Sequence, residues 1–341
     1  MNTANAAFAP AFDLQYFAAA VDTTASAGMS AEMKTFYEKR LIDQAEPKLI
    51  HDQFADYYPI PRNGGKTIEF RKYDSLPKAV TPLTEGVTPD GQNLNVSTVT
   101  STLAQYGGWT PESDVLSMTA IDNNILNATK VLASQAGRTM DTVTRDVLAG
   151  GTNVIYAPAI AADGTETEVT SRKDLTAACK LTPKLFFRAA AQLGAMNADT
   201  IGDSYVAVIH PYAAYDLKSN KDFIEISKYA HPEAIFNGEI GKLGNIRFVE
   251  TSEAKIWKDD TCPAGMAVFG TLVIGAHAYG VTEVEGGGLE HIVKQLGYGD
   301  DPLNQRASIG WKGLKAAERL VEQYMVRIES LSSYSATAAA N

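Results

Sequence analysis

A strand–turn–strand pattern between residues 67 and 103 constrains this chain more than any other feature. Ile68 and Phe70 alternate with polar residues, which is the period of a β-strand. The return segment 95–103 is rich in Thr, Ser and Val, and it is thin in apolar residues. Turn-forming residues separate the two segments: Pro77, Pro82, Gly86, Pro89 and Gly91. Such a hairpin has too little apolar surface to be stable alone in water. Because nothing adjacent in the sequence offers a neighbour, the pattern predicts a subunit that becomes ordered against other subunits.

The stretch from Thr110 to Gly151 has the features of one long helix. Thr110 suits the N-cap and Pro111 the first helical position, while Gly150 and Gly151 end the pattern. Roughly 38 residues would span about 57 Å at 1.5 Å per residue. Apolar residues recur at steps of three and four or their multiples: Val115, Met118, Ile121, Ile125, Leu132, Met140, Val143 and Val147. Two interpretations remain, an ordinary amphipathic helix of a helical domain or the spine of an extended, plate-like subunit.

The remaining chain divides at Gly151. Residues 1 to about 30 are Ala-rich and predict an extended arm, followed by a helix from Met33 to Ile50. After Gly151, α and β segments alternate, which predicts a compact α/β domain with a mixed sheet. We expect helices at 182–193, 213–217 and 223–229, and strands at 205–209, 246–250, 266–269 and 272–274. A late strand at 324–329 could pack on the long helix, and the tail from 330 to 341 is small and polar.

The composition excludes several classes of protein. The 341 residues suffice for two domains, and a net charge of −10 argues against a protein that grips nucleic acid through a basic surface. Cys179 and Cys262 are too few for a disulfide framework or a zinc knuckle, so we expect a reducing compartment. The N-terminus has no basic region of a secretory signal. The apolar run from Gly265 to Val281 is broken by glycines and predicts buried strands rather than a membrane span.

The sequence offers no motif to which a reaction can be assigned. Gly64-Gly65-Lys66-Thr67 resembles the end of a phosphate-binding loop, but Ile60 stands where that motif needs glycine, and a strand follows instead of a helix. A turn is the better interpretation. Gly238, Gly241 and Gly244 do not form the dinucleotide fingerprint, and we expect loop glycines with positive φ.

The titratable residues give the same answer. We expect structural roles for the five histidines, since none has metal-ligand spacing with another: His51, His210, His231, His277 and His291. Asp300 and Asp301 precede Pro302 and predict a solvated turn rather than a metal site. We therefore assign no catalytic, cofactor-binding or metal-binding residue, and we expect a protein that is not an enzyme.

Short segments spread in order along the chain resemble tailed-bacteriophage major capsid proteins of the Hong Kong 97 type. Each is weak alone, and together they are fairly specific. The segments are residues 36–41 (FYEKRL), 105–107 (QYG), 145–153 (RDVLAGGTN), 210–211 (HP), 238–241 (GEIG), 247–251 (RFVET), 301–306 (DPLNQR), 310–312 (GWK) and 325–329 (MVRIE).

The resemblance implies an α+β fold, the Hong Kong 97-like capsid fold, with four parts. Residues 1–56 would form an N-terminal arm with a short helix, and 57–109 an extended β-hairpin loop lying over the adjacent subunit. Residues 110–169 and 298–341 would form a peripheral domain with the spine helix, and 170–297 an α/β axial domain around the symmetry axes. The implied function is a major capsid protein that self-assembles into an icosahedral shell around the double-stranded DNA genome of a tailed phage.

The same resemblance implies the partners and the location. The chain would bind itself in pentamers and hexamers, with separate scaffolding, portal and decoration proteins as candidate partners. It would enclose DNA without sequence-specific binding, contact no membrane, and be assembled in the cytoplasm of the host bacterium into the virion capsid. Lys66, Lys72 and Lys78 lie where some relatives form isopeptide cross-links, but nothing selects one of them, so we predict no such chemistry.

Three alternatives stay open at this point. The first keeps the fold and is a bacterial nanocompartment shell, which encloses an enzyme instead of a genome. The second is a soluble α/β enzyme with its site in residues 171–297. The third is another virion component, such as a decoration or tail protein.

Overall fold

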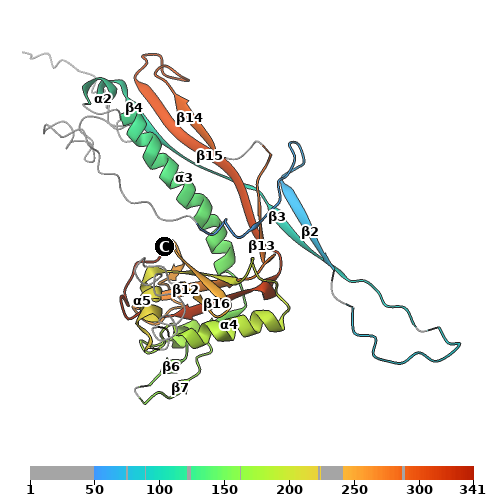
Figure 1. Cartoon of the computed structure of the whole chain (residues 1–341). Helices are drawn as coiled ribbons and strands as arrows, with labels where there is room; N and C mark the ends of the chain where they lie inside the picture. The colour runs from blue at the N-terminus through green and yellow to red at the C-terminus, as the bar shows by residue number, and fades with distance from the viewer. Residues whose placement is uncertain are drawn as a thin grey trace, which may run out of the picture. The chain divides into compact units, whose positions relative to one another are not determined.

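The computed structural model describes residues 50–73, 76–88, 90–120, 124–161, 163–221, 223, 241–285 and 289–341 (Figure 1). The predicted arm, most of the predicted helix Met33–Ile50 and the predicted helix 223–229 lie outside these residues, as does His231. The chain divides into two compact units. Within the described residues, unit 1 comprises 106–120, 124–136 and 289–313, and unit 2 comprises the rest. Residues 137–169 and 314–341 thus belong to the same unit as the predicted axial domain, whereas the sequence interpretation placed them in the peripheral domain.

Unit 2 contains a seven-stranded mixed sheet in the order β5-β16-β12-β8-β10-β9, with β11 also paired to β12. β8 runs parallel to β10, and β16 parallel to β5, while β12 is antiparallel to both β8 and β16. The mixed sheet predicted from the sequence is confirmed. The strands are β5 (Val154–Tyr156), β8 (Tyr205–Ile209), β9 (Lys242–Leu243), β10 (Ile246–Glu250), β11 (Ile256–Trp257), β12 (Val268–Ile274) and β16 (Met325–Ser330).

Both faces of this sheet are covered, which explains why β8 and β12 are continuous apolar runs. On one face, α4 (Pro183–Ala195) and α5 (Pro211–Ser219) pack against Ala207, Ile209 and Phe269. On the other, Val206 and Leu272 pack in a second cluster. That second cluster also contains Leu148, Tyr279, Val281 and Ala317.

One strand prediction needs correction. The predicted strands 266–269 and 272–274 belong to a single strand, β12, which begins at Val268, because Gly270 and Thr271 continue the ladder with β16. Glycine is needed there because a Cβ on residue 270 would lie 2.5 Å from the Trp257 ring. The predicted late strand is β16, which lies inside the seven-stranded sheet with every one of its residues buried. As predicted, it packs on the long helix, since Met325 shares the second cluster with Leu148.

Helix α4 begins as predicted, with Thr182 at the N-cap and Pro183 in the first turn. Its predicted end at Gly194 is slightly early, since the helix continues to Ala195 and Met196 is the C-cap. The chain then turns at Asn197, which has a φ of 56°. Asparagine tolerates this left-handed conformation better than most residues, so it ends the helix in place of glycine.

The long helix α3 runs from Asn124 to Ala149, so the predicted start at Thr110 is wrong. Residues 104–113 form strand β4 instead, and Ser113 is the N-cap of a short helix, α2 (Asp114–Thr119), accepting a hydrogen bond from the Leu116 N–H at 3.2 Å. Pro111 is tolerated because β4 pairs only with β15 among the described strands, and proline is accepted at a sheet edge. The 26 residues of α3 span about 39 Å. The predicted end at Gly150 is confirmed.

In unit 1, the first part of β15 (Arg306–Arg319) pairs with β14 (Glu290–Lys294), with Val293 opposite Ile309, and β4 also pairs with β15. Trp311 is buried, and its Nε1 donates to Gln135 Oε1 on α3 at 3.0 Å.

In unit 2, the second part of β15 pairs with β13 (Tyr279–Thr282), which also pairs with β1 (Asp56–Tyr57). The remaining elements are β2 (Thr67–Tyr73), β3 (Val96–Thr102), β6 (Ala159–Ile160), β7 (Glu166–Thr167) and the short 3₁₀ turns η1 (Arg172–Asp174) and η2 (Glu322–Tyr324).

Candidate functional site

The hairpin predicted from the sequence is confirmed, and its base is anchored within the chain. β2 and β3 pair antiparallel from Thr67 opposite Thr102 to Tyr73 opposite Val96. Phe70 packs edge-on against Tyr58, with ring centroids 5.0 Å apart. Ile68 packs against a small cluster of Ile60, Leu103, Ala316 and Val284. We expected nothing adjacent in the sequence to support the hairpin, but its base packs against Tyr58 and Ile60, which lie just before it, and against Val284 and Ala316 far along the chain.

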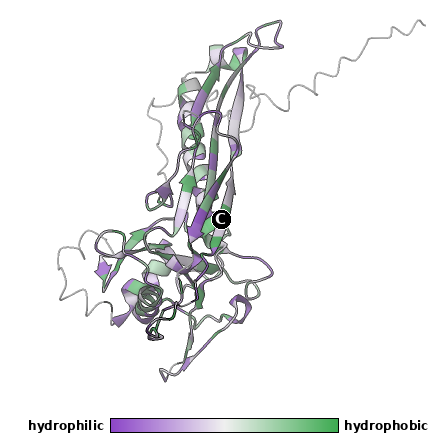
Figure 2. Cartoon of the chain, turned by 90° about the vertical axis from the view of Figure 1, so that its right-hand side faces the viewer, coloured by the Kyte–Doolittle hydropathy of each residue, from purple (hydrophilic) through white to green (hydrophobic). Residues whose placement is uncertain are grey.

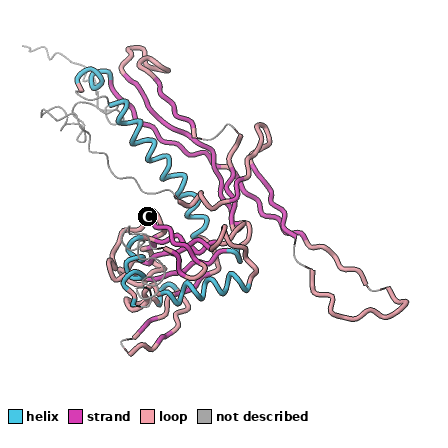
Figure 3. Tube along the Cα trace, viewed as in Figure 1, coloured by secondary structure: helices cyan, strands magenta, loops and turns pink. Residues whose placement is uncertain are grey.

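The distal part of the hairpin has no such support. The described residues 76–88 and 90–95, between the two strands, are all exposed, and they form a long loop (Figures 1 and 3). Several are large and apolar: Leu76, Val80, Leu83, Val87 and Leu94. Val80 is 80% exposed. The loop therefore carries large apolar side chains that the described part of the chain does not bury.

Unit 1 also exposes apolar side chains, even though it contains the buried pair Ile309 and Trp311. Trp109 on β4 is 65% exposed, and it lies beside Gly310, where a Cβ would come within 2.9 Å of the Trp109 Cβ. Further exposed residues of unit 1 are Val115, Met118, Val131, Val293, Leu296, Tyr298 and Leu303. Unit 1 thus leaves several large apolar side chains uncovered by the described part of the chain.

The C-terminal half of α3, in unit 2, is held by polar contacts in addition to the apolar packing of Leu148 and Val147. The sequence pattern pointed to Met140, Val143 and Val147, but the fully buried residues include Asp141 and Arg145. Figure 2 shows hydrophobic and hydrophilic residues mixed along this helix. We give the name polar socket to the residues outside the helix that bind this half of α3. They are residues 50–52, Glu253, Lys255, Lys315, Arg319 and Arg327.

Asp141 binds the first described residues of the chain. Its Oδ1 accepts hydrogen bonds from the Ile50 and His51 N–H groups at 3.1 and 2.9 Å, and its Oδ2 lies 2.6 Å from His51 Nδ1. Burial alone would raise the pKa of Asp141, but the hydrogen bonds and charge of His51 hold it below its ordinary value. The Tyr279 hydroxyl donates to the His51 carbonyl, and burial raises the pKa of that phenol. This segment is therefore fixed to the helix by side chains and main chain together.

Next along the socket, Asp52 accepts hydrogen bonds from Thr144 Oγ1 at 2.6 Å and from Lys315 Nζ. Lys315 is almost fully buried, and its Nζ also donates to the Met140 carbonyl. A buried ammonium is stable only when paired in this way. Arg145, also on α3, donates from its Nη1 to the Glu253 carbonyl at 3.0 Å.

The end of α3 is capped by arginines from two strands. Arg319 Nη1 donates to the Val147 carbonyl at 3.0 Å, and Arg327 Nη1 donates to the carbonyls of Ala149 and Gly151. These are the carbonyl groups that a helix leaves unpaired at its C-terminus, where positive charge is favourable. Glu329, fully buried, balances this charge by accepting from Arg327 and, through both oxygens, from Arg172. No sequence motif signalled this cluster.

The histidines and cysteines have structural contacts where they are described. Burial lowers the pKa of His210 to about 4, and its Nδ1 accepts from the Tyr212 N–H as the N-cap of α5. His277 has a φ of 57° and pairs with Asp56 at 2.8 Å, while His291 is exposed on β14. Cys179 and Cys262 are both free and buried. The side chains of His51, His210 and His277 thus each have a hydrogen-bond partner within the chain.

The glycine-rich motifs also form turns. Gly64 donates to the Pro61 carbonyl and Gly65 has a φ of 96°, so residues 61–66 form a turn that leads into β2. Gly241 and Gly244 have positive φ, as predicted for loop glycines. Asp301 lies in a turn in which its Oδ2 accepts from the Arg306 N–H at 2.7 Å. Burial opposes ionisation of Asp301, but this and neighbouring main-chain N–H groups lower its pKa.

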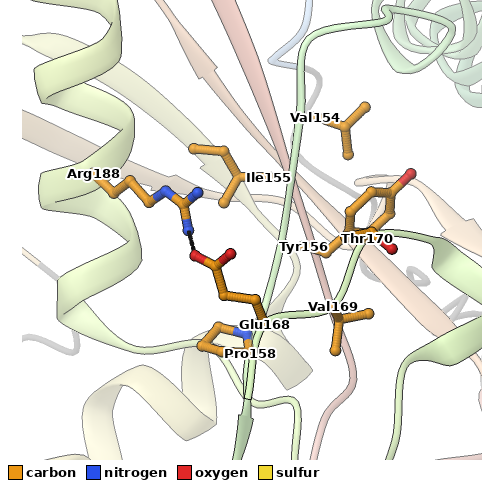
Figure 4. A pocket seen from close by; sticks show the side chains of 8 residues that line it. All are labelled: Val154, Ile155, Tyr156, Pro158, Glu168, Val169, Thr170 and Arg188. Atoms are coloured by element: carbon orange, nitrogen blue, oxygen red, sulfur yellow. Dashed lines mark ion pairs between the residues drawn. The ribbon is translucent and has the colours of Figure 1, made fainter. Parts of the chain in front are cut away.

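A cavity of about 250 Å³ lies beside β5, lined by residues 154–156, Pro158, 168–170 and Arg188 (Figure 4). Glu168 and Arg188 face each other across it at 3.6 Å, and both are largely exposed. Its lining contains neither histidine nor cysteine. Within the described part of the chain, no cluster of His, Cys, Asp and Glu could hold a metal ion, and no helix is long and apolar enough to span a membrane.

The extended hairpin, the long helix and the mixed sheet define the Hong Kong 97-like class of capsid proteins. A family model described as phage capsid protein matches residues 85–292, and the chain belongs to this family. It is a major capsid protein of a tailed phage, a structural protein of the virion capsid that self-assembles into a shell. No curated protein matches the sequence.

Solved structures share the fold at low sequence identity. The capsid of Ralstonia phage GP4 matches with a TM-score of 0.65 and 13% identity, over 92% of this chain and 98% of that chain. The capsid of cyanophage P-SCSP1u has a TM-score of 0.65 and 14% identity, with coverage of 92% and 98%. The head of Helicobacter pylori bacteriophage KHP40 has a TM-score of 0.62 and 13% identity, with coverage of 86% and 94%.

Proposed function

We propose that this chain forms pentamers and hexamers that close into an icosahedral shell around double-stranded DNA. The observation that carries the proposal is the exposed apolar loop of the hairpin, which contrasts with its anchored base. Because the base is anchored, the direction of the loop is fixed. Covering the apolar side chains of the loop with a partner lowers the free energy, since it removes apolar surface from water. In a closed symmetric assembly, each copy can supply that cover to the next.

The parts of the chain take the following roles in this proposal. The arm that precedes residue 50 reaches a neighbouring subunit, and the loop between β2 and β3 lies over the adjacent subunit. The unit that contains residues 106–120 and 289–313 takes the peripheral role and carries the N-terminal half of α3. The unit that contains residues 170–221 and 314–341 takes the axial role and gathers around the five-fold and quasi-six-fold axes. The polar socket supports this arrangement, because it fixes the end of α3 through contacts on several sides.

We further propose a separate scaffolding protein, a portal protein and decoration proteins as partners, and assembly in the cytoplasm of the host bacterium. The net charge of −10 suits a container that repels its packaged DNA and makes no sequence-specific contact with it. The chain acts as a building unit rather than as an enzyme.

Electron microscopy and sedimentation velocity of the purified protein, alone and with its scaffolding protein, test this proposal. We expect closed particles or rings of five and six. Deleting Val80–Gly91 should leave the subunit folded but abolish closed particles. A matched control keeps the loop length and changes only the charged residue Lys78 to Ala, which should still assemble. A monomer or dimer under every condition, or intact shells from the deletion, would contradict the proposal.

A further inference from the structure

The C-terminal segment 331–341 is attached to unit 2 along its length. The Leu331 N–H donates to the Cys179 carbonyl at 2.9 Å, and the Ala267 N–H donates to the Ala336 carbonyl at 2.8 Å. Between these points, Tyr334 stacks on Tyr212 with centroids 4.7 Å apart. A small, polar tail gives no sequence signal for such docking.

The last residue of the segment makes the most specific contacts. Asn341 Oδ1 accepts from the Ile256 N–H at 2.9 Å, and Asn341 Nδ2 donates to the Ala254 carbonyl at 2.8 Å. The side-chain amide therefore pairs with both sides of the loop between β10 and β11, as a neighbouring backbone would. An aspartate could satisfy only the first of these two contacts.

Lys255, in the same loop, connects this segment to α3. Its Nζ lies 2.9 Å from the Asn341 carbonyl oxygen and 3.0 Å from Asp146 Oδ1 on the helix. The Lys255 side chain is only 19% exposed, so the pair is partly shielded from solvent. Two residues earlier, Glu253 contacts the helix through Arg138 at 3.1 Å and through Arg145.

We propose that residues 331–341 are a latch that positions the C-terminal half of α3 through Lys255. The segment holds the loop at Ala254 and Ile256, and the loop then presents Glu253 and Lys255 to the helix. Lys255 is thus a positioning residue that transmits the docking of Asn341 to Asp146. The inference concerns a single chain and holds whether or not the assembly proposed above is correct.

Hydrogen exchange followed by mass spectrometry on the full chain tests the latch, with all variants in the same assembly state. We expect Asn341→Ala and Lys255→Met each to accelerate exchange of residues 143–149 about tenfold, since removing these contacts favours local opening. Exchange of β8 and β12 should not change. Lys255→Arg should restore most of the protection, and Asn341→Asp should fall between the wild type and Asn341→Ala.

The double variant Asn341→Ala/Asp146→Asn separates a latch from two independent contacts. If Lys255 connects Asn341 to Asp146, residues 143–149 of the double variant should exchange no faster than in the faster-exchanging of the two single variants, Asn341→Ala and Asp146→Asn. The reason is that the effects of coupled contacts do not add. Fold-changes that multiply would overturn the proposal. Faster exchange confined to 251–258, or equally faster exchange throughout β8 and β12, would also overturn it.

Discussion

The seven-stranded sheet and the loop of the hairpin differ in how their apolar side chains are covered. Every residue of β8 and β12 is buried, with helices on one face and a second apolar cluster on the other. The loop between β2 and β3 carries Val80 and Leu83 in full contact with solvent. The sheet is therefore completed by its own chain, whereas the loop carries apolar side chains that the described part of the chain leaves uncovered.

The largest expected difference is in subunit stability. Phe269→Ala removes a fully buried ring from the sheet core and should lower the free energy of unfolding by about 3–5 kcal/mol. Leu83→Ala on the loop should change it by less than about 0.5 kcal/mol. Chemical denaturation of the unassembled chain measures both. Similar losses for the two variants would mean that the loop is supported within the subunit.

The polar socket should give the next largest effect. Asp141→Asn keeps the size of the side chain but weakens the hydrogen bonds to His51 and Ile50, so we expect a loss of about 1–3 kcal/mol in the free energy of unfolding. Because the folded-state pKa of Asp141 is lowered, its stabilisation is present above its ordinary pKa of 3.8 and is lost as the pH falls further. Asp163→Asn, in an exposed turn, is the control and should cost much less.

A smaller, pH-dependent effect should come from the sheet side of α5. Folding lowers the pKa of His210 from 6.5 to about 4, so the unfolded chain binds the extra proton between these values. Stability should therefore fall as the pH drops below 6.5, by at most about 1.4 kcal/mol per pH unit. His210→Asn keeps an acceptor at the N-cap without titrating there. An unchanged pH profile in this variant would exclude His210 as the cause.

The smallest effect on the subunit should come from Trp109→Ser in unit 1. Since Trp109 is 65% exposed, the free energy of unfolding should change by less than about 0.5 kcal/mol. Assembly should nevertheless weaken, because an exposed tryptophan is a typical anchor of a protein interface. Light scattering during assembly measures this. Unimpaired assembly would show that the exposed side chains of unit 1 do not bind a partner.

Local patterns predicted much of this fold. The alternation around Ile68 and Phe70 identified the hairpin, the apolar run 205–209 identified β8, and the runs 266–269 and 272–274 identified the two ends of β12 without their connection. The cap at Thr182-Pro183 identified α4. The start of α3 was missed because the apolar spacing runs on through residues 110–119, which form the end of β4, paired with β15, and the separate short helix α2.

The contacts that hold the hairpin base and α3 could not be predicted, since they join residues far apart in sequence. Nothing in the sequence near Asp141 indicates His51 as its partner, 90 residues away. Likewise, a search for buried apolar positions overlooks Arg145 and Lys315, which are buried because partners satisfy their charge. Polar packing of this kind has no simple periodicity.

Cysteine labelling of the hairpin loop tests the central claim most directly. Cys179 and Cys262 are buried, so a Leu83→Cys variant adds one readily accessible thiol to the described part of the chain. Its rate of reaction with a maleimide is measured in dissociated subunits and in assembled particles. If a second copy covers the loop, labelling should be at least about tenfold slower in the particles. Equal rates in the two states would show that the loop remains exposed after assembly and would contradict the account.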